Sequence, residues 1–252
     1  MEHDDLSEQE RAIYEWQIWV SGFGEAGQRK LKAASVLVSR AGGVGGALAF
    51  QLAAAGVGRI ILAHAGNLRA SDLNRQVLMR HDAIDQSRVE CAAQRLREFK
   101  NDIDVVAIAE NVSQENASRL VSMADVVADC APLFAERFLM NREAVRQRKP
   151  MVECAMYETE LHVTTIVPGK TPCLACLYPE TPPHWTRQFP VFGAVAATAG
   201  SLGAMEVIKV IAGFGEPLAG KLLTADLRTM DFRRVNIQRR PECAVCGEVA
   251  AQ

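Results

Sequence analysis

The sequence lacks the features that would suggest a nucleic-acid-binding protein or a membrane protein. Its 252 residues carry a formal net charge of −2, and no basic stripe points to nucleic acid. We find no apolar run near the roughly 18 residues that predict a membrane span. The first ten residues, MEHDDLSEQE, are acidic and polar, the opposite of a signal peptide. We therefore expect a cytoplasmic protein that binds neither nucleic acid nor a membrane.

The seven cysteines do not predict a disulfide framework, because their number is odd and no secretion signal is seen. Four of them form two C-x-x-C pairs, and each pair presents two thiolates at the spacing that tetrahedral zinc requires. A redox dithiol is the alternative, but it needs only one pair, normally at the start of a helix. The pattern favours a structural zinc held by Cys173, Cys176, Cys243 and Cys246. The other three, Cys91, Cys130 and Cys154, lie in apolar stretches, and we expect inert core residues.

A glycine-rich turn is the feature around which the chain is organised. A short apolar run at 36–38 leads into four glycines and then into an alanine-rich segment that stops at Gly56. Strand, tight turn and helix in this order form the first half of a Rossmann-type βαβ unit. The N–H groups at such a helix start favour an anion such as a phosphate, and tight packing alone is the alternative. The four glycines are Gly42, Gly43, Gly45 and Gly46.

Three positions near this turn decide how it is interpreted. Arg40 stands where the first glycine of a G-x-G-G-x-G loop belongs, and its side chain narrows the approach of a pyrophosphate. His64 ends the second expected strand, where an acidic residue would bind a ribose hydroxyl, and a structural histidine is the simpler interpretation. Arg75, in a polar loop, has a geometry that suits bidentate binding of a triphosphate, with a surface ion pair as the alternative.

The apolar pattern predicts an α/β fold with a Rossmann-like, mostly parallel sheet and helices on both faces. Up to residue 155, expected strands at 36–38, 59–63, 104–109, 126–129 and 151–155 alternate with expected helices at 85–99, 116–123 and 134–148. Antiparallel strands are expected afterwards, at 161–167, 222–226 and 230–235. A proline-rich crossover loop is expected at 179–190, and a small-residue helix at 193–213 suits close packing or a dimer interface.

We divide this single domain into three parts. Residues 1–34 form an N-terminal helical segment, with helices expected at 10–20 and 25–33. Residues 35–156 form the Rossmann-like, nucleotide-binding-type region, and residues 157–252 form a C-terminal part that carries the four-cysteine zinc site.

In this order the motifs resemble those of the ThiF/MoeB/HesA adenylyltransferases, the bacterial relatives of ubiquitin-activating enzymes. The resemblance extends from about residue 13 to residue 247 and rests on YEWQI, GGVGG, DLNRQ, VVADC, PCLAC, GSLGAMEVIKVIAG and CAVCG. It implies a homodimer with an ATP–Mg site in each subunit, which adenylates the C-terminal glycine of a ubiquitin-like sulfur carrier. That chemistry needs cations for the phosphates, an acidic group for Mg²⁺ and a carboxylate for the ribose.

The sequence keeps only part of the site that the resemblance implies. Arg75 and Gln76 match the N-x-x-R-Q motif of the family, while Asp72 replaces its asparagine. Arg88 replaces the phosphate-binding lysine, which keeps the charge and changes its geometry. Asp129 matches the first aspartate of D-C-T-D-N. Other positions of the family pattern carry a different residue. Trp16 replaces the arginine that reaches across the dimer, Arg40 replaces the loop glycine, and His64 replaces the aspartate that binds the ribose. Gly66 replaces a further acidic residue, Pro132 replaces the aspartate that assists Mg²⁺, and the cysteine that some members use would fall near Thr186.

These replacements predict a degenerate ATP site. Loss of one preorganised electrostatic contact costs about 10²–10³ in rate, and we expect the combined losses to abolish ordinary adenylation, although such effects are not additive. We therefore do not expect ordinary binding of ATP and Mg²⁺. The protein would instead dock a sulfur carrier, or form a heterodimer with a competent relative as its inactive half, although Trp16 argues against the second role.

Two alternatives remain open. In the first, the protein is an active adenylyltransferase with a rearranged site, in which Arg75 and Arg88 are the catalytic candidates and bind the phosphates together with Arg40. Mg²⁺ is then bound by Asp72 or Asp129. In the second, the old nucleotide cleft takes a different anionic metabolite, and Arg40 with His64 sets its identity.

Overall fold

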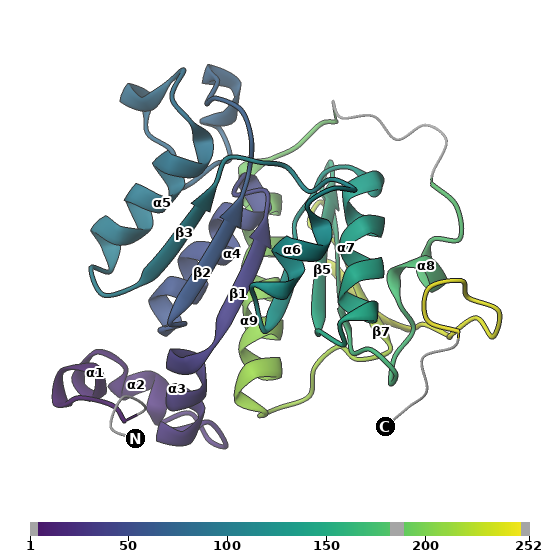
Figure 1. Ribbon diagram of the computed structural model, residues 1–252, viewed down its shortest axis with the longest axis horizontal. Coiled ribbons are helices and arrows are strands. Elements are labelled where there is room, and N and C mark those ends of the chain that lie inside the picture. The colour runs from purple at the N-terminus through teal and green to yellow at the C-terminus, as the bar shows by residue number, and fades with distance from the viewer. Residues whose placement is uncertain (1–4, 182–188, 248–252) are drawn as a thin grey trace.

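The computed structural model describes residues 5–181 and 189–247, and an eight-stranded sheet forms its centre (Figure 1). The strand order is β3-β2-β1-β4-β5-β6-β7-β8. The first five strands pair in parallel, and β5 to β8 pair antiparallel. The strands are β1 Ser35–Ser39, β2 Arg59–Ala63, β3 Asp104–Ile108, β4 Val126–Asp129, β5 Met151–Tyr157, β6 Glu160–Ile166, β7 Lys221–Asp226 and β8 Asp231–Asn236. The predicted parallel sheet with an antiparallel continuation is confirmed.

Helices cover both faces of this sheet. They are α1 Glu8–Ile13, α2 Glu15–Ile18, α3 Gly24–Ala33, α4 Gly43–Ala55, α5 Arg88–Phe99, α6 Ala117–Ser122, α7 Phe134–Arg146, α8 Leu174–Leu177 and α9 Gly193–Ala212, with 3₁₀ turns at Ala70–Asp72 and His81–Ala83. Alternate residues of a strand point to opposite faces. Val36 and Val38 accordingly pack with α4, α5 and α9, whereas Leu37 packs with α6 and α7.

Helix α9 is long and apolar enough to cross a membrane, so our expectation of no such segment is wrong by length and composition. In the fold, however, this helix packs against α4 and against strands β5 and β6. Val195, Ala199 and Val207 belong to the apolar core on that side of the sheet. Its small residues therefore serve close packing under the sheet, as expected for a core helix of a globular protein.

The N-terminal helix expected at residues 10–20 is divided into two short helices at Tyr14. The Tyr14 side chain is buried, and a Cβ added to Gly56 would lie 2.6 Å from its ring. The apolar residues that have helical spacing in this segment, Ile13, Trp16 and Val20, are all exposed. The segment is thus helical on both sides of Tyr14, and the side chain that packs against the rest of the protein is Tyr14, at the break between the two helices.

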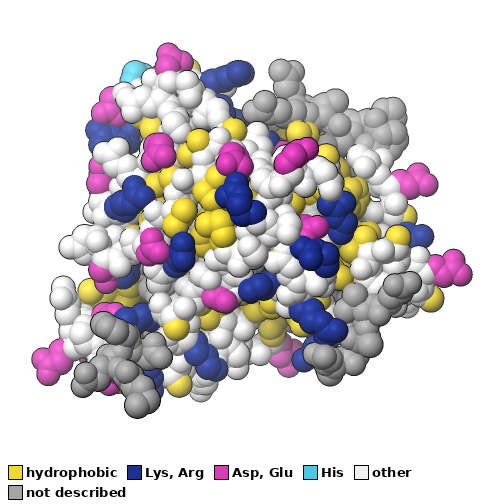
Figure 2. Space-filling view, viewed as in Figure 1, with side chains coloured by type: hydrophobic (Ala, Val, Ile, Leu, Met, Phe, Trp, Pro, Cys, Tyr) yellow, Lys and Arg dark blue, Asp and Glu magenta, His cyan; other side chains and the backbone are white. Residues whose placement is uncertain are grey.

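Charges of both signs are interspersed over the face of the molecule shown in Figure 2, with apolar side chains between them. The segment α1–α3 lies at one end of the molecule, and the C-terminal cysteine loop lies beside α8 at the other (Figure 1).

Candidate functional site

The glycine turn connects β1 to α4, as predicted, and winds tightly around the carbonyl group of Arg40. The Gly42 N–H donates to that carbonyl over 2.6 Å. A Cβ at Gly45 would clash with the same oxygen, so only glycine fits there. Arg40 itself has a φ of 63°, in the left-handed region that ordinary residues rarely adopt. The backbone of a phosphate-binding turn is therefore formed, with an arginine held at its entrance.

The side chain of Arg40 is bound by a carboxylate of the chain itself. Its Nε donates to Glu136 Oε2 over 2.8 Å, and its Nη2 donates to Glu136 Oε1. Both side chains are buried, and Glu136 lies in the first turn of α7. Sequence reasoning missed Glu136, because a glutamate 96 residues away carries no local signal of this contact.

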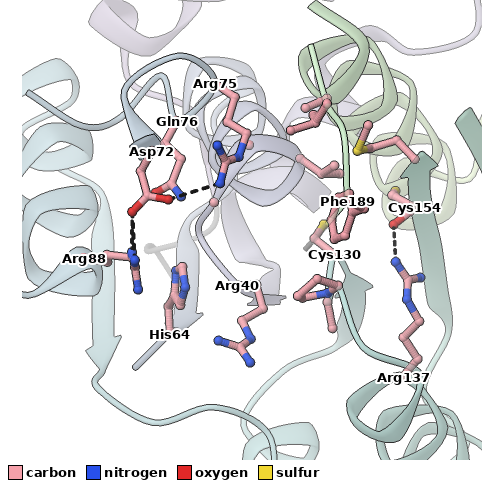
Figure 3. Close-up of a pocket in the computed structure, with 18 residues that line it drawn as sticks. Arg40, His64, Asp72, Arg75, Gln76, Arg88, Cys130, Arg137, Cys154 and Phe189 are labelled. Carbon is pink, nitrogen blue, oxygen red and sulfur yellow. Dashed lines mark hydrogen bonds and ion pairs between the residues drawn. The ribbon is translucent and has the colours of Figure 1, made fainter. Parts of the chain in front are cut away.

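Asp72 binds two of the predicted phosphate-binding arginines at once (Figure 3). Its Oδ2 accepts from Arg88 Nη2 over 2.8 Å, and its Oδ1 accepts from Arg75 Nη2 over 3.2 Å. Oδ2 also accepts the backbone N–H of Arg69. Although burial acts to raise the pKa of Asp72, these hydrogen bonds and positive charges hold it below its ordinary value. Asp72 is therefore an ionised partner for both arginines.

Asp129 is fully buried at the end of β4 and belongs to a second ion-paired group. It accepts the Ala131 N–H and lies 3.4 Å from Arg137 Nη1, while Arg137 also donates to Glu153 Oε1 over 2.6 Å. Burial raises the pKa of Asp129 despite the positive charge of Arg137. Neither Arg137 nor Glu153 was among the predicted site residues.

A cavity of about 140 Å³ brings most of the predicted site together (Figure 3). The predicted residues among those that line it are Arg40, Gly42, Gly43, His64, Asp72, Arg75, Gln76 and Arg88; Gly45 and Asp129 are not part of this lining. Two neighbouring cavities, of about 320 and 550 Å³, are also lined by Arg88. His64 is buried, and its backbone N–H donates to Ile108.

Two cysteines expected to be inert core residues are buried but also line this cavity (Figure 3). Cys130 follows β4 and Cys154 lies in β5. A hydrogen bond with Cys130, together with burial, raises the pKa of Cys154 well above its ordinary value. The thiol of Cys154 is therefore held in the neutral, unreactive form that suits a packing role. The third, Cys91, is only partly buried.

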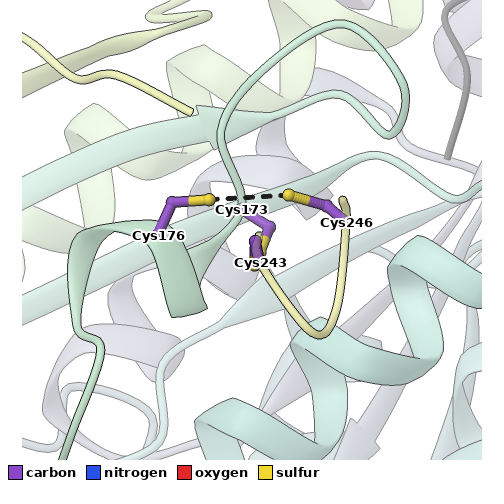
Figure 4. Close-up of side chains that lie close together, drawn as sticks. All are labelled: Cys173, Cys176, Cys243 and Cys246. Atoms are coloured by element: carbon purple, nitrogen blue, oxygen red, sulfur yellow. Dashed lines mark hydrogen bonds between the residues drawn. The ribbon is translucent and has the colours of Figure 1, made fainter. Parts of the chain in front are cut away.

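The four cysteines of the two C-x-x-C pairs converge as predicted (Figure 4). Their sulfur atoms all lie within 4.8 Å of one another, with Cys173 and Cys243 at 3.7 Å and Cys176 and Cys246 at 3.5 Å. Sulfurs bound at about 2.3 Å to one tetrahedral ion are about 3.8 Å apart. The group thus has the composition and spacing of a four-thiolate metal site, and it joins the C-terminal loop to α8.

Two further predicted positions lie away from this geometry. Trp16, in place of the arginine that would reach across a dimer, is 81% exposed on α2. Thr186 and the central part of the predicted crossover loop lie outside the described residues.

Comparison with known proteins gives a consistent result. The chain matches the ThiF family over residues 14–245. It is 46% identical to Protein HesA of Leptolyngbya boryana, covering 98% of this chain and 89% of that protein. It is 36% identical to the sulfur carrier protein adenylyltransferase of Thermus thermophilus, covering 95% and 92%. The crystal structure of E. coli MccB with ATP superposes with a TM-score of 0.78 at 28% identity, covering 88% of this chain and 68% of that one. The chain belongs to the ThiF family, among adenylyltransferase-like proteins that include HesA.

Proposed function

We propose that this ThiF-family protein no longer carries out ordinary ATP–Mg-dependent adenylation. It acts in the cytoplasm as a binding or partner module, or as a repurposed one, in a biosynthetic or sulfur-transfer pathway. The observation that carries this proposal is that each arginine lining the cleft is ion-paired with a carboxylate of the chain itself. These arginines are Arg40, Arg75, Arg88 and Arg137.

Breaking the Arg40–Glu136 ion pair is the largest free-energy cost that a phosphate would meet in this cleft. For a phosphate to bind Arg40 in the same geometry, it must displace Glu136 and leave a buried carboxylate without a partner. Removing one partner of a buried ion pair costs about 3–5 kcal/mol. A cost of that size lowers affinity by about two to four orders of magnitude. Space is not the limiting factor, because cavities of about 140, 320 and 550 Å³ lie side by side around Arg88.

Among the described residues, the two aspartates proposed to bind Mg²⁺ are also engaged by arginines. Mg²⁺ prefers carboxylate oxygens, but both oxygens of Asp72 accept hydrogen bonds from arginines. Asp129 is fully buried against Arg137. At the ribose position the neutral or cationic ring of His64 replaces a carboxylate acceptor.

Two observations support a protein partner for this chain: the name of one relative and the exposed apolar side chains near the N-terminus. The relative from Thermus thermophilus is named a sulfur carrier protein adenylyltransferase, and a sulfur carrier protein is therefore the first partner to test here. Exposed apolar side chains on α1 and α2 and at the following turn, Ile13, Trp16, Trp19 and Val20, support pairing with a second protein chain, in a homodimer or with a competent relative. The four cysteines, in this proposal, hold a structural zinc.

One observation favours a rearranged but active site as the second candidate. Among the described residues, Arg75 and Arg88 share one carboxylate, Asp72, so one positive charge there is not neutralised. That excess positive charge suits a nucleotide. It also suits a different anionic metabolite in the same cleft, whose identity Arg40 and His64 would set.

Calorimetry with ATP–Mg and pyrophosphate exchange with a sulfur carrier protein test the proposal. We expect no micromolar binding and no exchange above background, whereas the Thermus relative serves as the positive control. Glu136→Gln releases Arg40, so this variant is expected to bind ATP at least tenfold more tightly than the parent. Glu158→Gln, which alters an exposed carboxylate paired with Arg228, is the matched control and should change nothing. Micromolar affinity and carboxylate-dependent exchange by the unmodified chain would establish the second candidate instead.

A further inference from the structure

A separate cavity of about 320 Å³ lies between β5, β6 and the start of α7. We call it the β5–β6 cavity. Strand alternation places Glu153, Ala155 and Tyr157 of β5 on one face, and the register sets His162 of β6 opposite Ala155. Tyr157 is 44% exposed, so the cavity opens to solvent beside it. Its walls are mostly apolar and aromatic, with Phe134, Leu161 and Tyr178 among them.

The cavity contains a buried carboxylate oxygen that has no hydrogen-bond partner in the part of the chain that the structure describes. Glu153 is 1% exposed, and its Oε1 accepts from Arg137. Its Oε2 has no hydrogen-bond partner among the described residues. Leaving a buried polar atom unsatisfied costs about 1–3 kcal/mol, and more for a charged group. A ligand that brings an N–H donor to Oε2 recovers that cost.

The charges around Glu153 favour a cationic donor. The titratable groups around it come from β4, α7, β5, β6 and the segment after α8. They are Asp129, Arg137, Tyr157, Glu160, His162 and Tyr178. Burial lowers the pKa of His162, which keeps its ring neutral at pH 7. The single guanidinium therefore faces two buried carboxylates and a third at the rim. An ammonium group balances that excess, whereas a carboxylate or phosphate ligand would add to it.

The apolar walls define the rest of the ligand. The rings of Phe134 and Tyr178 lie edge to face with centroids 5.0 Å apart, next to the carboxylate. Tyr178 Oη lies 3.4 Å from His162 Nδ1, so these two polar atoms are directed at each other. Aromatic faces also attract cations, by about 0.5–1 kcal/mol at exposed sites and more in desolvated ones.

We propose that the β5–β6 cavity is a binding site for a small primary amine with an aromatic or branched aliphatic body, whose ammonium group donates to Glu153 Oε2. The site is distinct from the glycine-turn cleft, with which it shares Arg137 and Met156 in its lining. It does not depend on whether that cleft binds ATP.

Three probes of nearly equal shape test the proposal on the whole 252-residue chain. Calorimetry or ligand-observed NMR at pH 8 compares 2-phenylethylamine, neutral 2-phenylethanol and anionic 3-phenylpropionate. We expect the amine to bind at least tenfold more tightly than the alcohol, and the carboxylate not to bind. Equal binding of amine and alcohol, or tighter binding of the carboxylate, would overturn the proposal.

Two variants locate the binding. Glu153→Gln keeps the shape of the side chain and removes its charge, so it should weaken amine binding at least tenfold and leave alcohol binding within about twofold. Ala155→Leu fills the cavity and should abolish binding of both. Glu158→Gln, in the exposed turn after β5, is the matched control and should leave all affinities unchanged. If Glu153→Gln does not fold, the comparison of the three probes and the Ala155→Leu variant still test the proposal. Amine binding that Ala155→Leu leaves unchanged would show that the ligand binds elsewhere and would overturn the proposal.

Discussion

Arg40 and Glu136 form a buried, two-hydrogen-bond ion pair that joins the glycine turn after β1 to the first turn of α7. Arg40 stands at the position where the family pattern has a glycine, and that glycine would leave room for a phosphate. The same ion pair therefore affects both the free energy of unfolding and the ability of the cleft to bind a phosphate. The two roles can be separated by substitution, because each partner can be changed alone or together with the other.

Arg40→Gly restores the family residue but leaves Glu136 buried without its partner. We expect a loss of about 3–5 kcal/mol in the free energy of unfolding, reduced by the relief of the left-handed backbone at this position. Adding Glu136→Gln should recover much of that loss, because no buried charge then remains. Urea denaturation of the two single variants and the double variant measures this coupling. Additive losses would show that the pair does not stabilise the turn.

A second stability prediction concerns the contact between α9 and β5. A Cβ at Gly203 would clash with the sulfur of Cys154, so Gly203→Ala forces the helix away from the strand. Overpacking of this kind costs about 1–3 kcal/mol. Cys154→Ala removes the sulfur, and the double variant places the new methyl group in the space left behind. We expect the double variant to be more stable than Gly203→Ala alone, as measured by urea denaturation. A double variant as unstable as the sum of the two would rule out this contact as the cause.

The third prediction tests the four-thiolate site. We expect one zinc ion per chain by elemental analysis, and a lower midpoint of thermal unfolding after treatment with a chelator. Cys243→Ser should abolish stoichiometric zinc, because a closed four-sulfur site loses both a ligand and its charge balance. Cys91→Ser, outside the cluster, is the control. Full zinc content in Cys243→Ser would mean that the ion is held elsewhere.

Local patterns explain why much of the fold was predictable. The glycine turn, the strand–helix alternation and the two C-x-x-C pairs are each defined within a few residues, and the structure contains all three. The charge partners were not predictable. Glu136 lies 96 residues from Arg40, and Glu153 lies 16 residues from Arg137 on another element. Such contacts depend on how α7 docks over the ends of β4 and β5, which no periodicity encodes.

The tertiary contacts of other buried residues were also not predictable from the sequence. Cys130 and Cys154 lie in apolar sequence stretches and are indeed buried, yet both also line the cavity at the glycine turn. Tyr14 interrupts an otherwise helical pattern because its ring packs beside Gly56, a contact between segments 42 residues apart. In both cases the sequence predicts the type of element but not which side chain the tertiary contact selects.

The last prediction follows from Glu153. Burial raises the pKa of Glu153 to about 7, from 4.5, and outweighs the attraction of Arg137. Between these two values the native chain therefore binds a proton that the unfolded chain has released, and the free energy of unfolding must fall as pH rises. The expected fall is about 3 kcal/mol between roughly pH 4.5 and pH 7, with little further change above pH 8.

Urea denaturation at constant ionic strength measures this dependence, and Glu153→Gln isolates it. The variant has no proton to release, so its free energy of unfolding should decline less over the same interval and exceed that of the parent most clearly at pH 8. Asp129, whose pKa burial also raises, contributes in the same direction and remains in both proteins. Glu158→Gln, at an exposed carboxylate, should follow the parent curve. If Glu153→Gln also followed it, the buried carboxylate would be ionised throughout this range, held so by Arg137, and burial would not be the dominant influence on its pKa.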